Sequence, residues 1–462
     1  MMLPTTRSCR VPEGRGIDSA GIAPDVRMNP ILLKPTTDVG SQVIVNGQVR
    51  GNMQAMEYFR RKRDYIPAVL EAYNSLNSEY DVIVIEGAGS PAEINLKQDD
   101  IVNMGLAKLV DAPVLLVGDI DRGGVFAQLY GTVALLEPEE RARIKGLLIN
   151  KFRGDVSLFT PAIDFLEKKT GKPVLGVVPY VDDLGIDEED SVSLDDQEQR
   201  PAADKVSIAV VQVPKISNFT DFDSLAREDD VALYYARHPS DLAGADVVIL
   251  PGSKNTTEDL LFLRENGWPQ ALNDFMAQKK PVIGICGGYQ MMGEAVCDPE
   301  RTESDIGRVE GLHLLGVTTT FVSRKLTSQV TADCRELPFL GETLSIPDLS
   351  GYEIHMGRTE SGGDDVYPFI VTGRAGQPCQ NPAGAARKDG RAWGTYIHGL
   401  FDNDEFRRQF LNGLRKQKGW DALPVTRHYR QEKEAKYDRL ARIVRQSLDM
   451  KRLRQIMEEG IQ

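Results

Sequence analysis

The amino-acid sequence predicts an α/β protein with two parallel-sheet domains. At 462 residues the chain is too long for a single hydrophobic core. Short β-branched runs alternate with helical patterns up to Val178, and a second alternation of the same kind begins at Val206. Such alternation is typical of parallel strands that are covered by helices.

The first domain is expected to span residues 1–195. Buried strands are predicted at four short apolar runs that are bounded by Gly, Pro or Asp, and helical spacing separates them, as in Ile101–Val110. The predicted strands are Asp81–Ile85, Val114–Val117, Ile144–Ile149 and Val174–Val178.

A polar stretch separates the two domains. Residues 181–205 are rich in Asp and Glu, and we place the linker at 196–205. The second domain is then expected at 206–405, followed by a charged helical extension at 406–462. Its predicted strands are Val206–Val213, Ala245–Leu250 and Pro281–Cys286, before a more antiparallel set between Leu312 and His398.

The bulk composition excludes several classes of protein. The formal net charge of −13 argues against a nucleic-acid binder, although local basic groups can still hold a small anion. No run approaches the ~18 apolar residues that would span a bilayer, so we expect no membrane partner. Five widely spaced cysteines without a Cys-x-x-Cys pair argue against structural zinc and favour a reducing, cytoplasmic setting.

The most informative segment is Pro281–Met292, where an apolar strand enters Gly-Ile-Cys-Gly-Gly and a helical pattern follows. This pattern predicts a strand–nucleophile–helix elbow with Cys286 as the nucleophile. Glycines flank the cysteine because no Cβ fits beside a nucleophile in so tight a turn. A lone cysteine is more commonly a buried core residue, but its place in this pattern favours catalysis.

Two further segments could complete a catalytic site. Val247–Ser253 is a strand that ends in a Pro-Gly loop, and the N–H groups of Gly252 and Gly287 are candidate donors to an oxyanion. In Gly394–Gly399, His398 stands at a strand end, where its imidazole could reach the thiol. His355 has a similar glycine-flanked setting and remains the alternative base.

With these residues in place, the second half resembles the class I (triad-type) glutamine amidotransferases. Those enzymes form a γ-glutamyl thioester on the cysteine and release ammonia, and a Glu two residues after the His orients the imidazole. Here that position is Leu400, as in the cobyric acid and cobyrinic acid amidases that this chain resembles. Another group must therefore orient His398, and a backbone carbonyl, Asp402 and Glu353 all stay open.

The first half carries a Gly-rich loop after a strand, in Ile85–Ala92. Its match to the dinucleotide fingerprint is weak, because Pro91 and the polar residues Glu93–Asp100 do not open a helix. A carboxylate at this point, Glu86, suits Mg²⁺ and phosphates better, since Mg²⁺ prefers hard oxygen ligands. An ordinary strand-to-loop turn is the alternative.

From about Ala20 to Met450 the chain resembles the cobyric acid synthase family. The segments that carry the resemblance are Met28–Thr36, Asp38–Val43, Ile85–Asn95, Gly118–Phe126, Ile149–Gly154, Gly351–Gly357 and His398–Asp402. The resemblance implies a carbon–nitrogen ligase of cobalamin biosynthesis. It would use ATP and glutamine to amidate the b, d, e and g carboxylates of a corrinoid, adenosylcobyrinic acid a,c-diamide, giving adenosylcobyric acid.

The same resemblance implies the fold of each half. The first domain would be of the P-loop type and similar to dethiobiotin synthetase, with Glu86 as the acid of a Mg²⁺ and cofactor site. The second would be a flavodoxin-like class I amidotransferase domain. Whether the chain forms a homo-oligomer is left open.

One departure from the family is expected to matter. Family members open with a strand, a Gly-rich phosphate loop ending in Gly-Lys-Ser, and a helix, but GxxxxGK[ST] occurs nowhere in this sequence. Met1–Ser19 shows no strand or helix periodicity, so we expect the first βα unit to be missing and activity with ATP to be doubtful. The alternative function is then a truncated or silent amidotransferase-like partner with glutaminase activity alone or none. An amidase of a cell-wall lipid is a third reading, which the first half disfavours.

Overall fold

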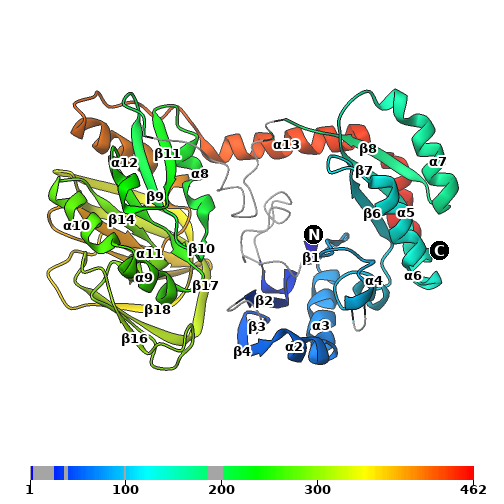
Figure 1. Ribbon diagram of the computed structural model, residues 1–462, viewed down its shortest axis with the longest axis horizontal. Helices are drawn as coiled ribbons and strands as arrows, with labels where there is room; N and C mark the ends of the chain where they lie inside the picture. Colours follow the sequence, from blue (N-terminus) through cyan, green and yellow to red (C-terminus); the bar gives the residue numbers. More distant parts are fainter. Residues whose placement is uncertain are drawn as a thin grey trace. The chain divides into compact units, whose positions relative to one another are not determined.

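The computed structural model describes the chain in six ranges and divides it into two compact units (Figure 1). The first unit is Met1–Ile186 with Lys433–Gln462, and the second is Asp187–Glu432. The described residues are 2–3, 25–35, 40–97, 100–182 with 184, and 201–461. Among them, no helix is both long and apolar enough to cross a membrane.

The second unit is built on a six-stranded sheet whose strands are almost entirely buried. Its order is β11 (Val231–Ala236), β9 (Val206–Val211), β12 (Val247–Leu250), β14 (Val282–Ile285), β22 (Ala392–Thr395) and β21 (Gly384–Ala386). The first five strands are parallel, and only β21 is antiparallel. Numbered along the chain, the parallel strands follow the order 2-1-3-4-5, which is that of the flavodoxin-like fold. The fold expected of this half is confirmed.

Four helices supply much of the remaining core of the second unit (Figure 1). Leu260, Leu272 and Phe410 are fully buried or nearly so and belong to the same apolar cluster as the strands. Burial of this size dominates the stability of such a domain. The helices are α9 (Thr256–Glu265), α10 (Trp268–Ala277), α11 (Gly287–Met291) and α12 (Asp404–Gln417).

A second, mostly antiparallel sheet follows in the chain, as the sequence predicted between Leu312 and His398. Its centre is a hairpin of two long strands, β17 (Val317–Phe339) and β18 (Glu342–Ser361). The flanking strands are β15 (Ala295–Cys297), β16 (Arg308–Glu310), β19 (Phe369–Arg374) and β20 (Gln377–Pro382). Tyr352 of β18 exchanges backbone hydrogen bonds with His398, at 3.2 and 2.9 Å, so this sheet fixes the main chain of the predicted base.

The described residues of the first unit form three small sheets rather than one. β6 (Val114–Asp119), β7 (Ile144–Phe152) and β8 (Val174–Pro179) are parallel, at three of the four predicted strand positions. The fourth run forms only β5 (Val84–Ile85), which pairs in parallel with β1 (Met2–Leu3). Within the described part of the chain β5 does not bond to β6, and Val84 is 57% exposed, so this run is not a buried central strand.

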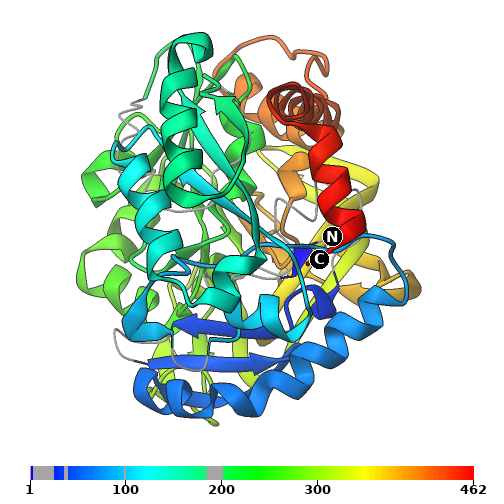
Figure 2. The same cartoon turned by 90° about the vertical axis from the view of Figure 1, so that its right-hand side faces the viewer.

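An antiparallel sheet in the first unit was not predicted. It consists of β2 (Ile31–Pro35), β3 (Gly40–Val45) and β4 (Gln48–Gln54). Figure 2 shows it in dark blue beside α2 (Ala55–Arg61) and α3 (Ile66–Asn77), and Val43 packs with Tyr58 and Val69 of those segments. The remaining helices of this unit are α4 (Met104–Leu109), α5 (Val125–Leu135), α6 (Pro138–Arg143), α7 (Thr160–Thr170) and α14 (Met450–Glu459).

The C-terminal stretch 406–462, expected as one extension, is divided between the units. α12 packs into the core of the second unit, while the division falls inside α13 (Tyr429–Ser447). Beyond it the chain packs on the first unit, where the Asp449 N–H donates to the Leu175 carbonyl at 2.8 Å. Of Met1–Ser19 the structure describes Met2–Leu3, which forms β1, and of the expected linker it describes residues 201–205.

Candidate active site

The candidate site lies at the carboxyl edge of the parallel sheet in the second unit. Gly252 follows β12, Cys286 follows β14 and His398 follows β22, and the segment after β9 brings a further residue, Asp221. The carboxyl ends of parallel strands meet at one edge, so loops from distant parts of the sequence converge there. This is why four residues spread over the unit can form one site.

Cys286 adopts the strained backbone of a nucleophile elbow. Its φ of 51° and ψ of −107° are rare for a residue with a side chain and cost about 1–3 kcal/mol. The Cys286 N–H donates to Thr395 O at 2.8 Å, and its carbonyl accepts from Gln290 N at 3.0 Å. A Cβ on Gly288 would lie 1.9 Å from the Leu250 carbonyl oxygen, so the glycine is required by space, as the sequence predicted.

The imidazole of His398 is oriented by a carboxylate that sequence reasoning missed. His398 Nδ1 lies 2.7 Å from Asp221 Oδ2, and the Gly399 N–H donates to Asp221 Oδ1 at 2.9 Å. Both side chains are buried, at 1% and 4% exposure. Both carboxylate oxygens of Asp221 therefore contact the segment that carries the predicted base.

The groups considered from the sequence do not fill this position. Among the residues that the structure describes, no backbone carbonyl takes it, and the Glu353 carboxylate instead accepts from Arg374, with an Nη2–Oε2 distance of 2.6 Å. Asp402 lies in η8 (Leu400–Asp402), which follows Gly399 in the chain. Leu400 occupies the position at which class I glutamine amidotransferases usually have the orienting Glu. It is a core residue with 1% exposure. The carboxylate thus comes from another element of the fold.

The surroundings of His398 favour its protonated form. Burial lowers the pKa of the imidazole, but the charges of Asp221 and Cys286 raise it by more. The resulting pKa lies well above the ordinary value for histidine. An imidazolium next to the sulfur stabilises a thiolate. His398 Nε2 is buried without a hydrogen-bond partner among the described residues, and the Cys286 thiol donates to Ile354 O at 3.5 Å. Such contacts commonly tighten only when substrate is bound.

Packing fixes the plane of the His398 ring. The ring of Tyr352 stacks on it, with 4.9 Å between centroids and 13° between planes. Asn218 Nδ2 donates to the Tyr352 hydroxyl at 2.9 Å, so the stacked ring is itself held in place. The imidazole can therefore turn little without disturbing buried neighbours.

The two predicted oxyanion glycines lie close to these residues. A Cβ on Gly252 would stand 3.6 Å from His398 Cε1, and a Cβ on Gly287 would stand 2.8 Å from the Ser253 amide nitrogen. The loop between β12 and α9 thus runs directly beside the elbow. The role of the two N–H groups as oxyanion donors stays a prediction.

A buried carboxylate holds this loop in place. Asp259 of α9 accepts from Ser253 Oγ at 2.6 Å and from Lys215 N at 3.0 Å, and it is fully buried. Burial raises the pKa of Asp259 from 3.8 to about 6, although the hydrogen bond from Ser253 acts in the opposite direction. Asp259 therefore ties the Gly252 loop to the neighbouring segment at an electrostatic cost.

The alternative base, His355, has a different setting. Its Nδ1 lies 2.8 Å from the Gly357 carbonyl, and its ring stacks on Tyr396 with 3.8 Å between centroids. The nearest carboxylate, Glu353, is 3.8 Å from Nε2 and is already bound to Arg374. The geometry favours His398 over His355 as the group that acts on Cys286.

In the first unit, Glu86 is an exposed residue directly after β5. The following Gly-rich loop is held by Asn103, whose side chain accepts from Ala88 N at 2.9 Å and donates to Ala88 O at 2.8 Å. No group of three or more metal-binding side chains occurs among the described residues. Mg²⁺ is commonly held by one or two carboxylates together with substrate phosphates, so a single Glu86 is compatible with it.

Comparison with known proteins gives a family match in each half of the chain. Residues 207–406 match the model of the CobB/CobQ-like glutamine amidotransferase domain, and residues 53–187 match that of an AAA domain. The cobyric acid synthase of Syntrophobacter fumaroxidans is 49% identical over 95% of this chain and 87% of its own length. The chain belongs to the cobyric acid synthase family.

Other family members match equally well. The cobyric acid synthases of Lachnoclostridium phytofermentans and Photorhabdus laumondii are 48% and 50% identical, each over 96% of this chain, and over 88% and 86% of their own lengths. The solved structure of PurLQS from Thermotoga maritima covers 46% of this chain and 96% of its own at 15% identity. Its TM-score of 0.33 is too low to support a conclusion.

The expected loss of the phosphate-binding loop is not borne out by these matches. The AAA domain model matches the first half, and the family relatives are matched over most of their own length. These matches give no support to the alternative of a truncated or silent partner.

Replacement of Asp221 by Asn tests the orienting carboxylate. Because the change removes the charge that holds His398 in place and protonated, we expect Asp221→Asn to lower kcat for glutamine hydrolysis on the order of 10²-fold or more. Asp402→Asn is the matched control and should change kcat little. A larger loss in Asp402→Asn than in Asp221→Asn would contradict this assignment.

Asp259 should make the stability of the second unit pH-dependent. Since its folded pKa is raised, stability falls as pH rises from 3.8 through about 6, by up to roughly 3 kcal/mol. Asp259→Asn removes this pH dependence of the free energy of unfolding. The stability of the variant relative to the unmodified chain should therefore rise between about pH 4 and about pH 7.

The measurement is urea unfolding followed by tryptophan fluorescence, because Trp268, Trp393 and Trp420 all lie in the second unit. Glu258→Gln, which removes the neighbouring exposed carboxylate, is the control and should leave the pH dependence in place. The same pH dependence in Asp259→Asn as in the unmodified chain would refute the assignment.

Proposed function

We propose that this chain catalyses the ATP- and glutamine-dependent amidation of peripheral carboxylates of a corrinoid in cobalamin biosynthesis. The substrate is adenosylcobyrinic acid a,c-diamide, amidated at b, d, e and g, and the product is adenosylcobyric acid. The observation that carries the proposal is the convergence of Cys286, His398 and Asp221 at one sheet edge, in a chain of this family.

Glutamine hydrolysis is the task of the second unit. The Cys286 thiolate attacks the γ-carboxamide carbon of glutamine, and the oxyanion formed is stabilised by the N–H groups of Gly252 and Gly287. The His398 imidazolium gives its proton to the departing nitrogen, so ammonia leaves and a γ-glutamyl thioester remains. His398, now neutral, takes a proton from water, which attacks the thioester and releases glutamate.

Amide formation is the task of the first unit. A carboxylate is a poor electrophile, so transfer of a phosphoryl group from ATP converts it to an acyl phosphate with a good leaving group. Ammonia then attacks the acyl carbon, the amide forms and phosphate departs. Glu86 is the residue we assign to Mg²⁺, which would supply charge neutralisation at the ATP phosphates.

Two observations support this assignment over a partner without ligase activity. The three relatives compared above are named cobyric acid synthase and match at least 95% of this chain, and so both of its halves. The second unit also keeps its nucleophile in a strained elbow, which is costly to maintain without a catalytic role.

Cys286→Ala tests the nucleophile. Glutamine hydrolysis should be abolished, because no thioester can form, while the melting curve followed by tryptophan fluorescence should change little. Amidation of the a,c-diamide with free ammonia and Mg-ATP should persist, since the ATP half is untouched. Glutamine hydrolysis that survives Cys286→Ala would refute the proposal for the second unit.

Glu86→Gln tests the Mg²⁺ assignment. Because one charge of the metal site is removed, the affinity for Mg-ATP, measured by titration calorimetry, should fall by roughly 10-fold or more. Glutamine hydrolysis at Cys286 should remain. Glu93→Gln, which removes an exposed carboxylate from the same loop, is the control. Equal Mg-ATP affinity in Glu86→Gln and the unmodified chain would exclude Glu86 as a ligand.

A further inference from the structure

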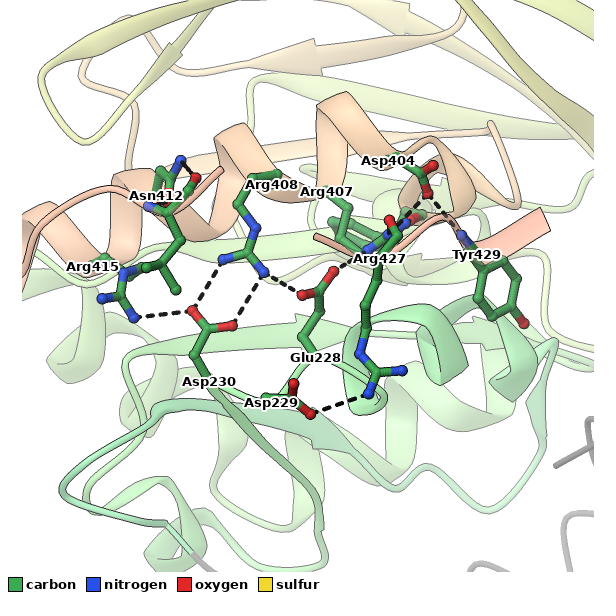
Figure 3. Close-up of polar contacts among 12 residues, drawn as sticks. Glu228, Asp229, Asp230, Asp404, Arg407, Arg408, Asn412, Arg415, Arg427 and Tyr429 are labelled. Atoms are coloured by element: carbon green, nitrogen blue, oxygen red, sulfur yellow. Dashed lines mark hydrogen bonds and ion pairs between the residues drawn. The ribbon is translucent and has the colours of Figure 1, made fainter. Parts of the chain in front are cut away.

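A buried ion network joins the two segments that carry Asp221 and His398. Figure 3 shows its members: Arg407, Arg408 and Arg415 on α12 face Glu228 and Asp230, which precede β11. Glu228 lies seven positions after Asp221, and Arg407 lies nine positions after His398. The network therefore connects the two catalytic segments at a second place, away from the imidazole.

Glu228 is the centre of the network. Its side chain is 3% exposed, and its Oε1 accepts from Arg407 Nε at 2.7 Å. Its other oxygen, Oε2, accepts from Arg408 Nη2. The two oxygens of this buried carboxylate thus bind two successive arginines of α12.

Arg407 carries the connection back toward the imidazole. Its side chain is 1% exposed, and its Nη1 donates to the Phe401 carbonyl at 2.8 Å, three positions after His398. Its Nη2 donates to Asp404 Oδ1 at 2.9 Å and to the Arg427 carbonyl at 3.0 Å. A lysine could not reproduce this fork of donors.

Arg408 and Asp230 extend the network along the helix. Both nitrogens of the Arg408 fork lie 3.1 Å from oxygens of Asp230, and Arg415 Nη1 also lies 3.1 Å from Asp230 Oδ2. Burial raises the pKa of Asp230, but the hydrogen bonds and charges of Arg408 and Arg415 together lower it below its usual value. Three arginines thus share two carboxylates.

These contacts close a ring of interactions. It runs from Asp221 along the chain to Glu228, across to Arg407, on to the Phe401 carbonyl, back to His398 and across again to Asp221. We propose that Glu228 is a positioning residue of the glutaminase reaction, which fixes the Asp221 segment against the His398 segment through Arg407. This inference rests on the proposed function and deepens it.

A positioning role accounts for the cost of the network. Buried ion pairs lose much hydration, and apolar residues of the same size would often give equal stability. What such a network supplies is one defined geometry, because each charge must keep its partner. Here the network defines the geometry of the contact between Asp221 and His398.

The consequence can be measured through the ionisation of His398. Within the described part of the chain, the charged or titratable groups that face its imidazole are Asp221, Cys286 and Tyr352, which carries a hydroxyl. If the Asp221 segment relaxes, its carboxylate holds the imidazolium less tightly and the pKa of His398 falls. The basic limb of the pH profile of kcat/KM for glutamine hydrolysis should then move to lower pH.

The test is Glu228→Gln in the full chain, with kcat, KM and the pH profile measured per folded molecule by active-site titration. We expect kcat to fall by roughly 10-fold or more, with KM for glutamine little changed and the basic limb shifted to lower pH. Asp229→Asn, the matched control, removes a charge from the next residue, whose side chain is 91% exposed. It should behave as the unmodified chain does.

A purely structural role predicts a different result. Glu228→Gln would then lower only the folded fraction, with kcat per folded molecule and the pH profile unchanged, and this outcome would overturn the inference. If Glu228→Gln does not fold, Arg407→Lys keeps the charge but loses the fork, and the same shift in kcat and in the basic limb is expected. An unshifted profile in Arg407→Lys would overturn the inference equally.

Failure of the proposed function can be told apart from failure of this inference. An unmodified chain without glutamine hydrolysis would overturn the function and the inference with it. Hydrolysis that is unaffected by Glu228→Gln would overturn the inference alone.

Discussion

The contact between Asp221 and His398 is the interaction on which the second unit's chemistry depends. It joins the segment after β9 to the segment after β22, and the two residues are 177 positions apart in the chain. The flavodoxin-like strand order makes the contact possible, because it brings the carboxyl ends of β9 and β22 to one edge. Without this carboxylate, burial alone would favour a neutral imidazole.

The site combines several features that each cost stability. Cys286 has a strained backbone, Asp221 and His398 bring charge into the interior, and Asp259 is buried with its pKa raised to about 6. The surrounding sheet core offsets these costs, since its strands are almost entirely buried. A rigid scaffold that carries a costly site is the arrangement expected of a preorganised active site.

How much of the site the sequence reveals depends on the distance between partners in the chain. Cys286 could be predicted because its glycines, its strand and its helix are adjacent in sequence, and His398 because it ends a strand between glycines. Asp221 has no such signal: it lies within the short turn Phe219–Phe222, and only the folded sheet shows that its oxygens reach His398. In the first unit the positions of β6, β7 and β8 could be predicted, but the pairing of β5 with the distant β1 could not. The run Asp81–Ile85 has the composition of a buried strand, yet Val84 remains exposed and only two residues pair.

The central claim is that Cys286 forms a covalent intermediate with glutamine under the control of His398. The direct measurement is to mix the chain with glutamine, quench it in acid and locate the γ-glutamyl adduct by peptide mass spectrometry. The account predicts one adduct, on the peptide that contains Cys286, and its loss in His398→Ala. An adduct on Cys297, Cys334 or Cys379 instead, or rapid hydrolysis by the Cys286→Ala chain, would contradict it.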